Sequence, residues 1–355
     1  MHFLHERPLD PHFKTAVSGS LNNHRRRVAA KVSAPTVYLA DLGIYPNGSS
    51  AEFPPGTGSE SLTNNRLFDD KPLSFDALQA LDVSLSLDAD KLIGTNFVLK
   101  ELDLDLSLDG GRLRISPAKL SYADGFISID GTVDTAGPRA EITVKIVAED
   151  VDMGGLLAHV HRPIIFGGHL NLTIDMHGVR RSSREIASTL TGEFGVGIEN
   201  GRVMRAVDLL GPDAIDLGTI LPVAKKYQDL NCFVIRFIFE DGVGNSQIIY
   251  IDTPNVRSRD RGSVNLSSET IDLVIQPKPK RGLPGTRSAV RIFGPLAKPK
   301  VRKLPFREAA RLFGEVFLPH IFLPPRALGY LWYLMKKDND EQSPCFIMAP
   351  EEPPS

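Results

Sequence analysis

The sequence offers few cross-linking residues: of its 355 residues, Cys232 and Cys345 are the only cysteines. Two cysteines cannot form the disulfide network of a small secreted scaffold, although they can form one bridge in an oxidising compartment. The chain also has little net charge, −2 at pH 7. Bulk electrostatics therefore give no basis for nucleic-acid binding, and we expect no nucleic-acid partner.

Uninterrupted apolar runs are missing as well. The most apolar window, Val316–Met335, contains three prolines, His320 and Arg326, which argue against a membrane-spanning helix. The first residues do not form a secretory signal, because charged residues such as Glu6 and Asp10 interrupt them. The printed sequence thus predicts neither a spanning helix nor an export signal.

Signatures of catalysis and of metal binding are also missing. No serine lies in a nucleophile elbow, and no phosphate-binding glycine loop follows a strand. Four histidines, His159, His161, His169 and His177, lie close in the sequence, but no carboxylate or cysteine shares a recognised ligand spacing with them. The sequence therefore predicts a protein that is not an enzyme and that uses no cofactor and no metal.

What the sequence has in quantity is alternation of apolar and polar residues. The stretch Glu101–Asp109 reads ELDLDLSLD, so its leucines share one face of a strand and its polar residues share the other. The same period of two recurs at Leu81–Leu87, Ile127–Val133, Ile142–Ile146, Leu170–Met176, Phe194–Ile198 and Phe233–Phe239. With short turns between these stretches, the pattern predicts a mainly β chain, a long antiparallel meander.

A few short helices interrupt this pattern. Ser74 is a candidate N-cap for a turn near Asp76, and Asp152 is a candidate cap for a helix ending near Val160. Further helical segments are expected at Ser182–Ala187, Met204–Tyr227 and Phe306–Phe317.

Composition divides the chain into four parts. Residues 1–70 show no sustained period and contain the cluster Arg25–Arg27 and a Pro/Gly/Ser-rich run, which predicts a poorly ordered N-terminal segment or linker. Residues 71–303 are predicted to form the β-domain. Residues 304–335 form a C-terminal helix and apolar segment, and residues 336–355 form a polar tail.

One face of so regular a sheet must be kept from water, and the predicted helices are too few and too short to cover it. The residues alone allow two solutions: a sandwich or barrel with a closed core, or a sheet curled into an open groove lined by apolar residues. In the second case the candidate lining residues are Leu102, Leu104, Leu106, Ile127, Ile129, Leu170, Leu172, Ile174, Phe233, Ile235, Phe237 and Phe239.

Several segments resemble a known family. RLFDDKPLSFDALQALD (Arg66–Asp82), LDGGRLRISP (Leu108–Pro117), LTGEFGVGIENGRV (Leu190–Val203) and, above all, the stretch from Leu230 to Lys280 resemble the C-terminal region of AsmA-like proteins. The likeness covers about residues 66–346 and ends in Ser343-Pro344-Cys345, which is similar to the family's terminal cysteine motif.

This resemblance implies a bacterial envelope protein, anchored in the inner membrane by an N-terminal helix, with its bulk on the periplasmic side. The family is linked to outer-membrane assembly and is similar to bridge-like lipid-transfer proteins, whose β-groove carries acyl chains. The resemblance therefore favours the open groove, with phospholipid or another envelope lipid as partner. The printed sequence lacks the anchor, and we expect it to precede Met1.

An alternative of another class is a non-enzymatic regulatory or structural module that acts on outer-membrane protein assembly and membrane protein targeting. It predicts a closed core and envelope proteins as partners. Mass spectrometry of co-purified lipid separates the two hypotheses, because a filled core leaves no room for lipid.

Two features near the C-terminus remain as expectations. Cys232 and Cys345 are a candidate disulfide, which would tie the tail to the start of a strand. In Val316–Met335, aromatic residues precede Lys336-Lys337, a pattern that suits a membrane surface; the candidate interface residues are Phe317, Phe322, Trp332 and Tyr333. A plug that closes one end of the sheet is the competing interpretation.

Overall fold

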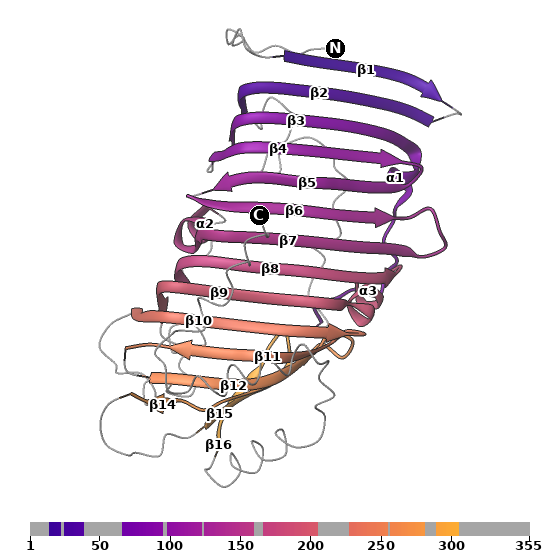
Figure 1. Cartoon of the computed structure of the whole chain (residues 1–355). Helices are drawn as coiled ribbons and strands as arrows, with labels where there is room; N and C mark the ends of the chain where they lie inside the picture. The colour runs from indigo at the N-terminus through magenta and orange to yellow at the C-terminus, as the bar shows by residue number, and fades with distance from the viewer. Residues whose placement is uncertain are drawn as a thin grey trace, which may run out of the picture.

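The computed structural model describes residues 14–22, 25–38, 66–94, 98–122, 124–159, 166–204, 227–254, 256–280 and 289–304. Within these residues the chain forms one sheet of sixteen strands and three short helices, α1 (Asp76–Ala80), α2 (Met153–His159) and α3 (Ser183–Thr189) (Figure 1). The predicted fold class, mainly β with a few short helices, is confirmed.

The strands follow one another along the sheet in chain order. They are β1 (Lys14–Asn22), β2 (Arg25–Tyr38), β3 (Leu81–Ile93), β4 (Val98–Asp109), β5 (Arg112–Tyr122), β6 (Gly125–Asp134), β7 (Ala140–Asp152), β8 (Phe166–Arg180), β9 (Thr191–Met204), β10 (Tyr227–Glu240), β11 (Val243–Asp252), β12 (Val256–Asn265), β13 (Thr270–Ile275), β14 (Lys278–Pro279), β15 (Ala289–Pro295) and β16 (Lys300–Leu304).

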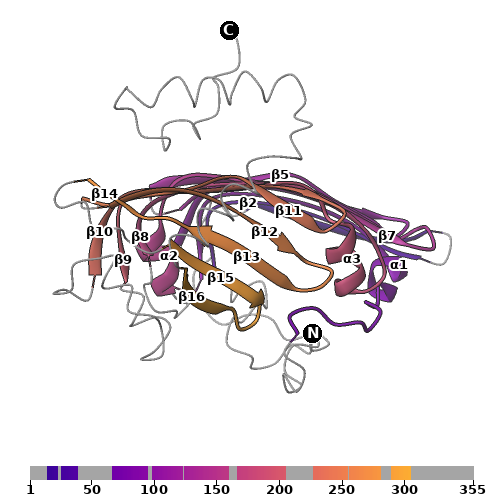
Figure 2. The same ribbon diagram turned by 90° about the horizontal axis from the view of Figure 1, so that it is seen from below.

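The sheet is an open antiparallel meander, as the sequence predicts, with β1 and β16 at its two ends. One pair departs from this pattern: the register shows that β2 and β3 run parallel. The short β14 pairs with β12 beside the main path. Turned on its side, the sheet is visibly curled, and α1, α2 and α3 lie on its concave side (Figure 2).

The N-terminal segment differs from what its sequence predicts. Residues 14–22 and 25–38 form β1 and β2 rather than a poorly ordered linker, and Arg25–Arg27 begins β2. The alternation in RRRVAAKVSAPTVY is hard to detect, because alanines occupy both faces and Pro35, which has no N–H to donate, interrupts the pairing with β3. The predicted boundaries of the β-domain at 71 and 303 remain a prediction.

The helices illustrate which local signals are reliable. Asp152 caps α2 as predicted, since its carboxylate accepts hydrogen bonds from the N–H groups of Gly154 and Gly155, both at 3.0 Å. Ser182 and Glu185 form a capping box at the start of α3. Ser74 does not cap α1; Phe75 holds that position without a side-chain hydrogen bond, and the Ser74 hydroxyl donates to Asp76 instead.

Three expectations fall largely or wholly outside the described residues. Met204 and Tyr227, the ends of the predicted long helix, lie in strands β9 and β10, and the residues between them are outside the description. The predicted helix at Phe306–Phe317 and the apolar segment Val316–Met335 also lie outside it.

Candidate functional site

The concave face of the sheet is built by strand register. Residues directly opposite each other in neighbouring strands point to the same face. One row of such opposed residues crosses six strands from β6 to β11: Ile127, Ala148, Leu172, Val196, Ile235 and Ile249. A second, parallel row consists of Ile129, Ile146, Ile174, Phe194 and Phe237. Apolar side chains thus run without a break across the strands.

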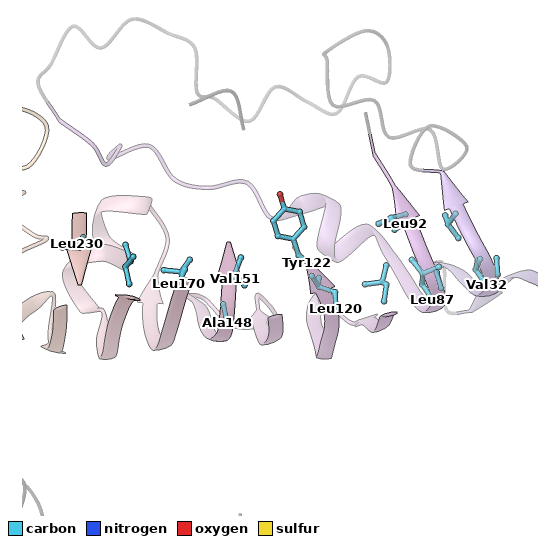
Figure 3. Close-up of a cluster of buried hydrophobic side chains, with 14 residues drawn as sticks. Val32, Leu87, Leu92, Leu120, Tyr122, Ala148, Val151, Leu170 and Leu230 are labelled. Carbon is cyan, nitrogen blue, oxygen red and sulfur yellow. The ribbon is translucent and has the colours of Figure 1, made fainter. Parts of the chain in front are cut away.

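The leucines of β4 continue this face towards the N-terminal end of the sheet. Leu102 lies opposite Ala89 of β3, and Leu104 lies opposite Leu87. Leu87 in turn pairs with Val32 of β2, so the apolar face extends to the parallel pair. Figure 3 shows side chains of this cluster pointing to one side of the strands, from Val32 at one end to Leu230 at the other.

Strand register therefore places all twelve candidate lining residues on one face, as the groove hypothesis requires. Their exposure divides them into two groups. Four are buried: Leu102, Leu170, Phe237 and Phe239. The other eight are only partly buried: Leu104, Leu106, Ile127, Ile129, Leu172, Ile174, Phe233 and Ile235. A closed core between two sheets would bury the second group as well, so these eight side chains keep some contact with solvent.

Bulges enlarge the concave face beyond what alternation predicts. Ala148 and Val151 of β7 are three positions apart and should face opposite ways, yet both belong to the concave cluster. The register shifts between them, and Asp150 has φ of 56° there. Val151 is consequently fully buried opposite Leu170. Strict alternation in the sequence could not reveal this residue.

The same device recurs in β4. Leu99 and Leu102 are also three apart and share the concave cluster. Glu101 lies between them with φ of 52°, at a register shift against β5. These repeated bulges increase the local twist, consistent with the curl of the sheet in Figure 2.

The two rims of the sheet are shaped by different contacts. At the rim near α2, Met153 packs against the concave cluster, together with Leu172 and Val203. At the rim near α3, a second concave cluster forms from Phe237, Phe239, Ile249 and Leu273. Phe239 lies opposite Gly244, where a Cβ would come within 2.5 Å of its ring, so the glycine makes room for the aromatic side chain.

A strap of chain, residues 66–75, runs along the rim near α3. Its backbone is held by Leu73 N–H donating to the Arg181 carbonyl at 2.8 Å, and by Leu67 N–H donating to the Glu269 carboxylate at 2.5 Å. Glu269 lies between β12 and β13, so the strap links α1, near β3, to the far end of the sheet.

Arg184 at the start of α3 fixes the middle of the strap. Its Nη2 donates to the Glu269 carboxylate at 2.8 Å and to the Phe68 carbonyl at 3.1 Å, while its Nε lies 2.5 Å from Asp70. The Glu269 side chain is 6% exposed and that of Arg184 is 18% exposed, which makes this a buried ion pair. No pattern in the sequence predicts this pair, because it joins residues 85 positions apart and carries no motif.

The apolar row changes character at β12. Ile249 lies opposite Asp260, and Ile251 lies opposite Ser258. Both polar residues are buried, and Asp260 accepts hydrogen bonds from the Ser258 hydroxyl and from the Gln276 N–H. Their hydrogen-bonding groups are used within the protein, so this end of the row is closed by an internal polar contact.

The convex face carries the opposite chemistry. Lys145 lies between Asp130 and Asp175 of the neighbouring strands, and Arg236 pairs with Glu193 at 2.6 Å. Nearer the turns, a hydrogen bond from the Ala136 N–H, followed by one from Arg112, lowers the pKa of Asp134. Cross-strand opposite charges of this kind suit a solvated face.

Only some of the other candidate residues belong to the part of the chain that the structure describes. Cys232 is 1% exposed and is disulfide-bonded; Cys345 lies outside the described residues, as do Phe317, Phe322, Trp332 and Tyr333. In the described part of the chain, His169 contacts Asp150 at 2.9 Å, and no group of three or more potential metal ligands occurs. Among the same residues, no helix has the length and apolarity to span a membrane.

The fold and its concave face define a class: a single-layer, curled and open antiparallel sheet with an apolar concave face. Comparison with family models gives the family. The AsmA family model matches residues 12–249, and the chain belongs to the AsmA family. This match begins earlier and ends earlier than the resemblance seen in the sequence, and it includes β1 and β2. Searches of curated proteins and of solved structures found no match.

Proposed function

We propose that the chain holds lipid acyl chains in its concave groove, on the periplasmic side of the bacterial inner membrane, for phospholipid transport between membranes or for outer-membrane homeostasis. The observation that carries this proposal is the partial exposure of the eight apolar lining residues on a face that runs across the strands. Contact between water and an apolar surface of this length is unfavourable. An acyl chain is also apolar and would shield this surface from water.

The energetics suit a passive carrier. Each buried methylene contributes about 0.8 kcal/mol, so ten methylenes contribute about 8 kcal/mol before the cost of ordering the chain. The rows offer aliphatic and aromatic groups without hydrogen-bonding partners from β6 to β11, so no position holds the chain more strongly by polar contacts. A chain bound in this way can slide along the groove.

Family membership supports this proposal in its general form. Neither catalytic chemistry nor a cofactor is required, because the groove acts by burial of apolar surface alone. The alternative is a non-enzymatic module that affects outer-membrane protein assembly and membrane protein targeting. The same apolar face would then receive a protein segment rather than a lipid.

A photo-crosslinking amino acid at Ile174, compared with one at Asp175, tests the proposal. The two residues are adjacent in β8 and face opposite sides of the sheet, so they share backbone and location. Irradiation in intact bacterial cells should give lipid adducts at position 174 and none at 175. Protein adducts confined to position 174 would support the alternative, and equal adducts at both positions would contradict both.

A further inference from the structure

On the convex face, the described parts of β10 and β11 carry a buried apolar cluster. Cys232, Val234, Ile248 and Tyr250 are between 1% and 5% exposed. They alternate along β10 and β11 with Phe233, Ile235, Ile249 and Ile251, which belong to or pack against the concave clusters. The four residues therefore point to the convex side.

The described residues offer no layer that covers this cluster. Helix α1 packs mainly against β3 and β5, α2 against β7 and β8, and α3 against β8. The cross-strand neighbour of Val234 in β9 is Gly197, which has no side chain. A sheet face without a covering layer leaves its side chains partly exposed, so burial to this degree requires another segment of the chain.

The redox state of Cys232 identifies that segment. Cys232 is disulfide-bonded, no described cysteine is a free thiol, and the sequence has one other cysteine, Cys345. The residues after it, Phe346, Ile347 and Met348, are apolar. We propose that the segment Ser343–Met348 docks on the convex cluster, that a Cys232–Cys345 disulfide fixes it there, and that its apolar side chains cover Val234, Ile248 and Tyr250.

Charged residues beside the convex cluster also favour docking of the segment Ser343–Met348. Arg259 lies directly opposite Tyr250, and Arg257 lies opposite Asp252 at the margin of the cluster. Both arginines are exposed. The chain just beyond Met348 carries Glu351 and Glu352, which can pair with these arginines when the segment is docked.

Docking has a structural consequence for the rest of the C-terminal region. Leu304 ends β16 and is fully buried, so the chain leaves the sheet from a fixed point. A bond at Cys345 fixes a second point on β10. The bond therefore limits how far the chain between Leu304 and Cys345 can extend, and reduction removes that limit.

The test uses the full chain purified without reductant. Proteolysis and mass spectrometry of the unreduced digest should show the Cys232 peptide joined to the Cys345 peptide within one molecule. Free thiols at both positions, or a bridge between two copies, would overturn the proposal. This test is independent of whether the concave groove binds lipid.

Hydroxyl-radical footprinting measures the cover itself. Tyr250 should be protected in the full chain and should gain labelling several-fold when residues 343–355 are removed, whereas the already exposed Tyr38 should not change. Should the truncated chain fail to fold, the full-length Cys345→Ser,Phe346→Ser,Ile347→Ser variant, compared with the unchanged chain, provides the second comparison. Unchanged protection of Tyr250 in a folded chain without this segment would overturn the proposal.

Discussion

The two faces of the sheet carry side chains from the same strands but have opposite properties. On the concave face, opposed residues are apolar in strand after strand, as in the row from Ile127 to Ile249. On the convex face, the matching positions alternate in charge, as in Asp130, Lys145 and Asp175. The comparison shows that a single-layer sheet can gather apolar side chains on one face while charged and polar side chains on its other face are solvated.

The largest expected effect comes from the floor of the concave face. Ile198 is 2% exposed, so Ile198→Ala should lower the free energy of unfolding by about 4 kcal/mol, through lost burial and a cavity. Its neighbour Glu199, on the convex side, provides the control, and Glu199→Ala should change stability by less than about 0.5 kcal/mol. Urea unfolding followed by circular dichroism measures both; similar losses would mean that the faces do not differ as described.

The next effect concerns the strap along the concave rim. Arg184→Ala should cost about 3 kcal/mol, because it leaves the buried Glu269 carboxylate without its cation. Arg66→Ala removes an exposed ion pair with Asp70, whose atoms are 3.4 Å apart, and should cost less than about 0.5 kcal/mol. Both variants are compared by urea unfolding. Equal costs would show that burial of the Arg184 pair contributes nothing.

A charged residue introduced among the partly exposed lining residues should destabilise the fold less than Arg184→Ala does. It should clearly reduce the amount of lipid that the groove holds. Leu172→Asp should cost about 2 kcal/mol and strongly reduce co-purified lipid, because it desolvates a carboxylate beside the acyl chain. Thr173→Asp places the same charge one residue away on the convex face and should leave both quantities nearly unchanged. Lipid extraction with mass spectrometry measures occupancy, and undiminished lipid in Leu172→Asp would contradict the proposed groove.

The smallest effect is a pH dependence from the convex cluster. Burial, and then Asp252, raise the pKa of Tyr250 above its usual value near 10, although Arg257 and Arg259 oppose this. Above pH 10 the unfolded chain therefore loses this proton more readily than the folded chain, so stability falls as pH rises. Tyr250→Phe should reduce that fall.

The control for the pH prediction lies on the concave face. Burial, and then Asp152, also raise the pKa of Tyr122, which belongs to the concave cluster. Tyr122→Phe should reduce a separate part of the decline in stability above pH 10. Thermal unfolding of the two single variants and the double variant between pH 8 and pH 11 measures both parts. A slope identical to that of the unchanged protein in all three variants would contradict the assignment.

Much of the architecture could be predicted from the sequence where the pattern was local. The alternation in Glu101–Asp109 predicts β4, and the alternation in Phe233–Phe239 predicts β10, because side chains in a strand alternate by steric necessity. The cap at Asp152 was predictable for the same reason: it depends on residues two and three positions away.

The failures of prediction have equally specific causes. β1 and β2 were missed, since small alanines give little contrast between the faces of β2. Val151 was missed because a bulge at Asp150 reverses its direction. The Arg184–Glu269 pair was missed because it depends on how a strap crosses the rim of the finished sheet.

The sequence by itself determined which residues share a face, because a period of two leaves each strand only one way to separate apolar from polar groups. Only the tertiary structure decided that the sheet stays open, where its bulges lie, and which apolar side chains remain accessible. Those properties follow from curl, register and covering segments, and these arise from contacts between residues far apart in the chain.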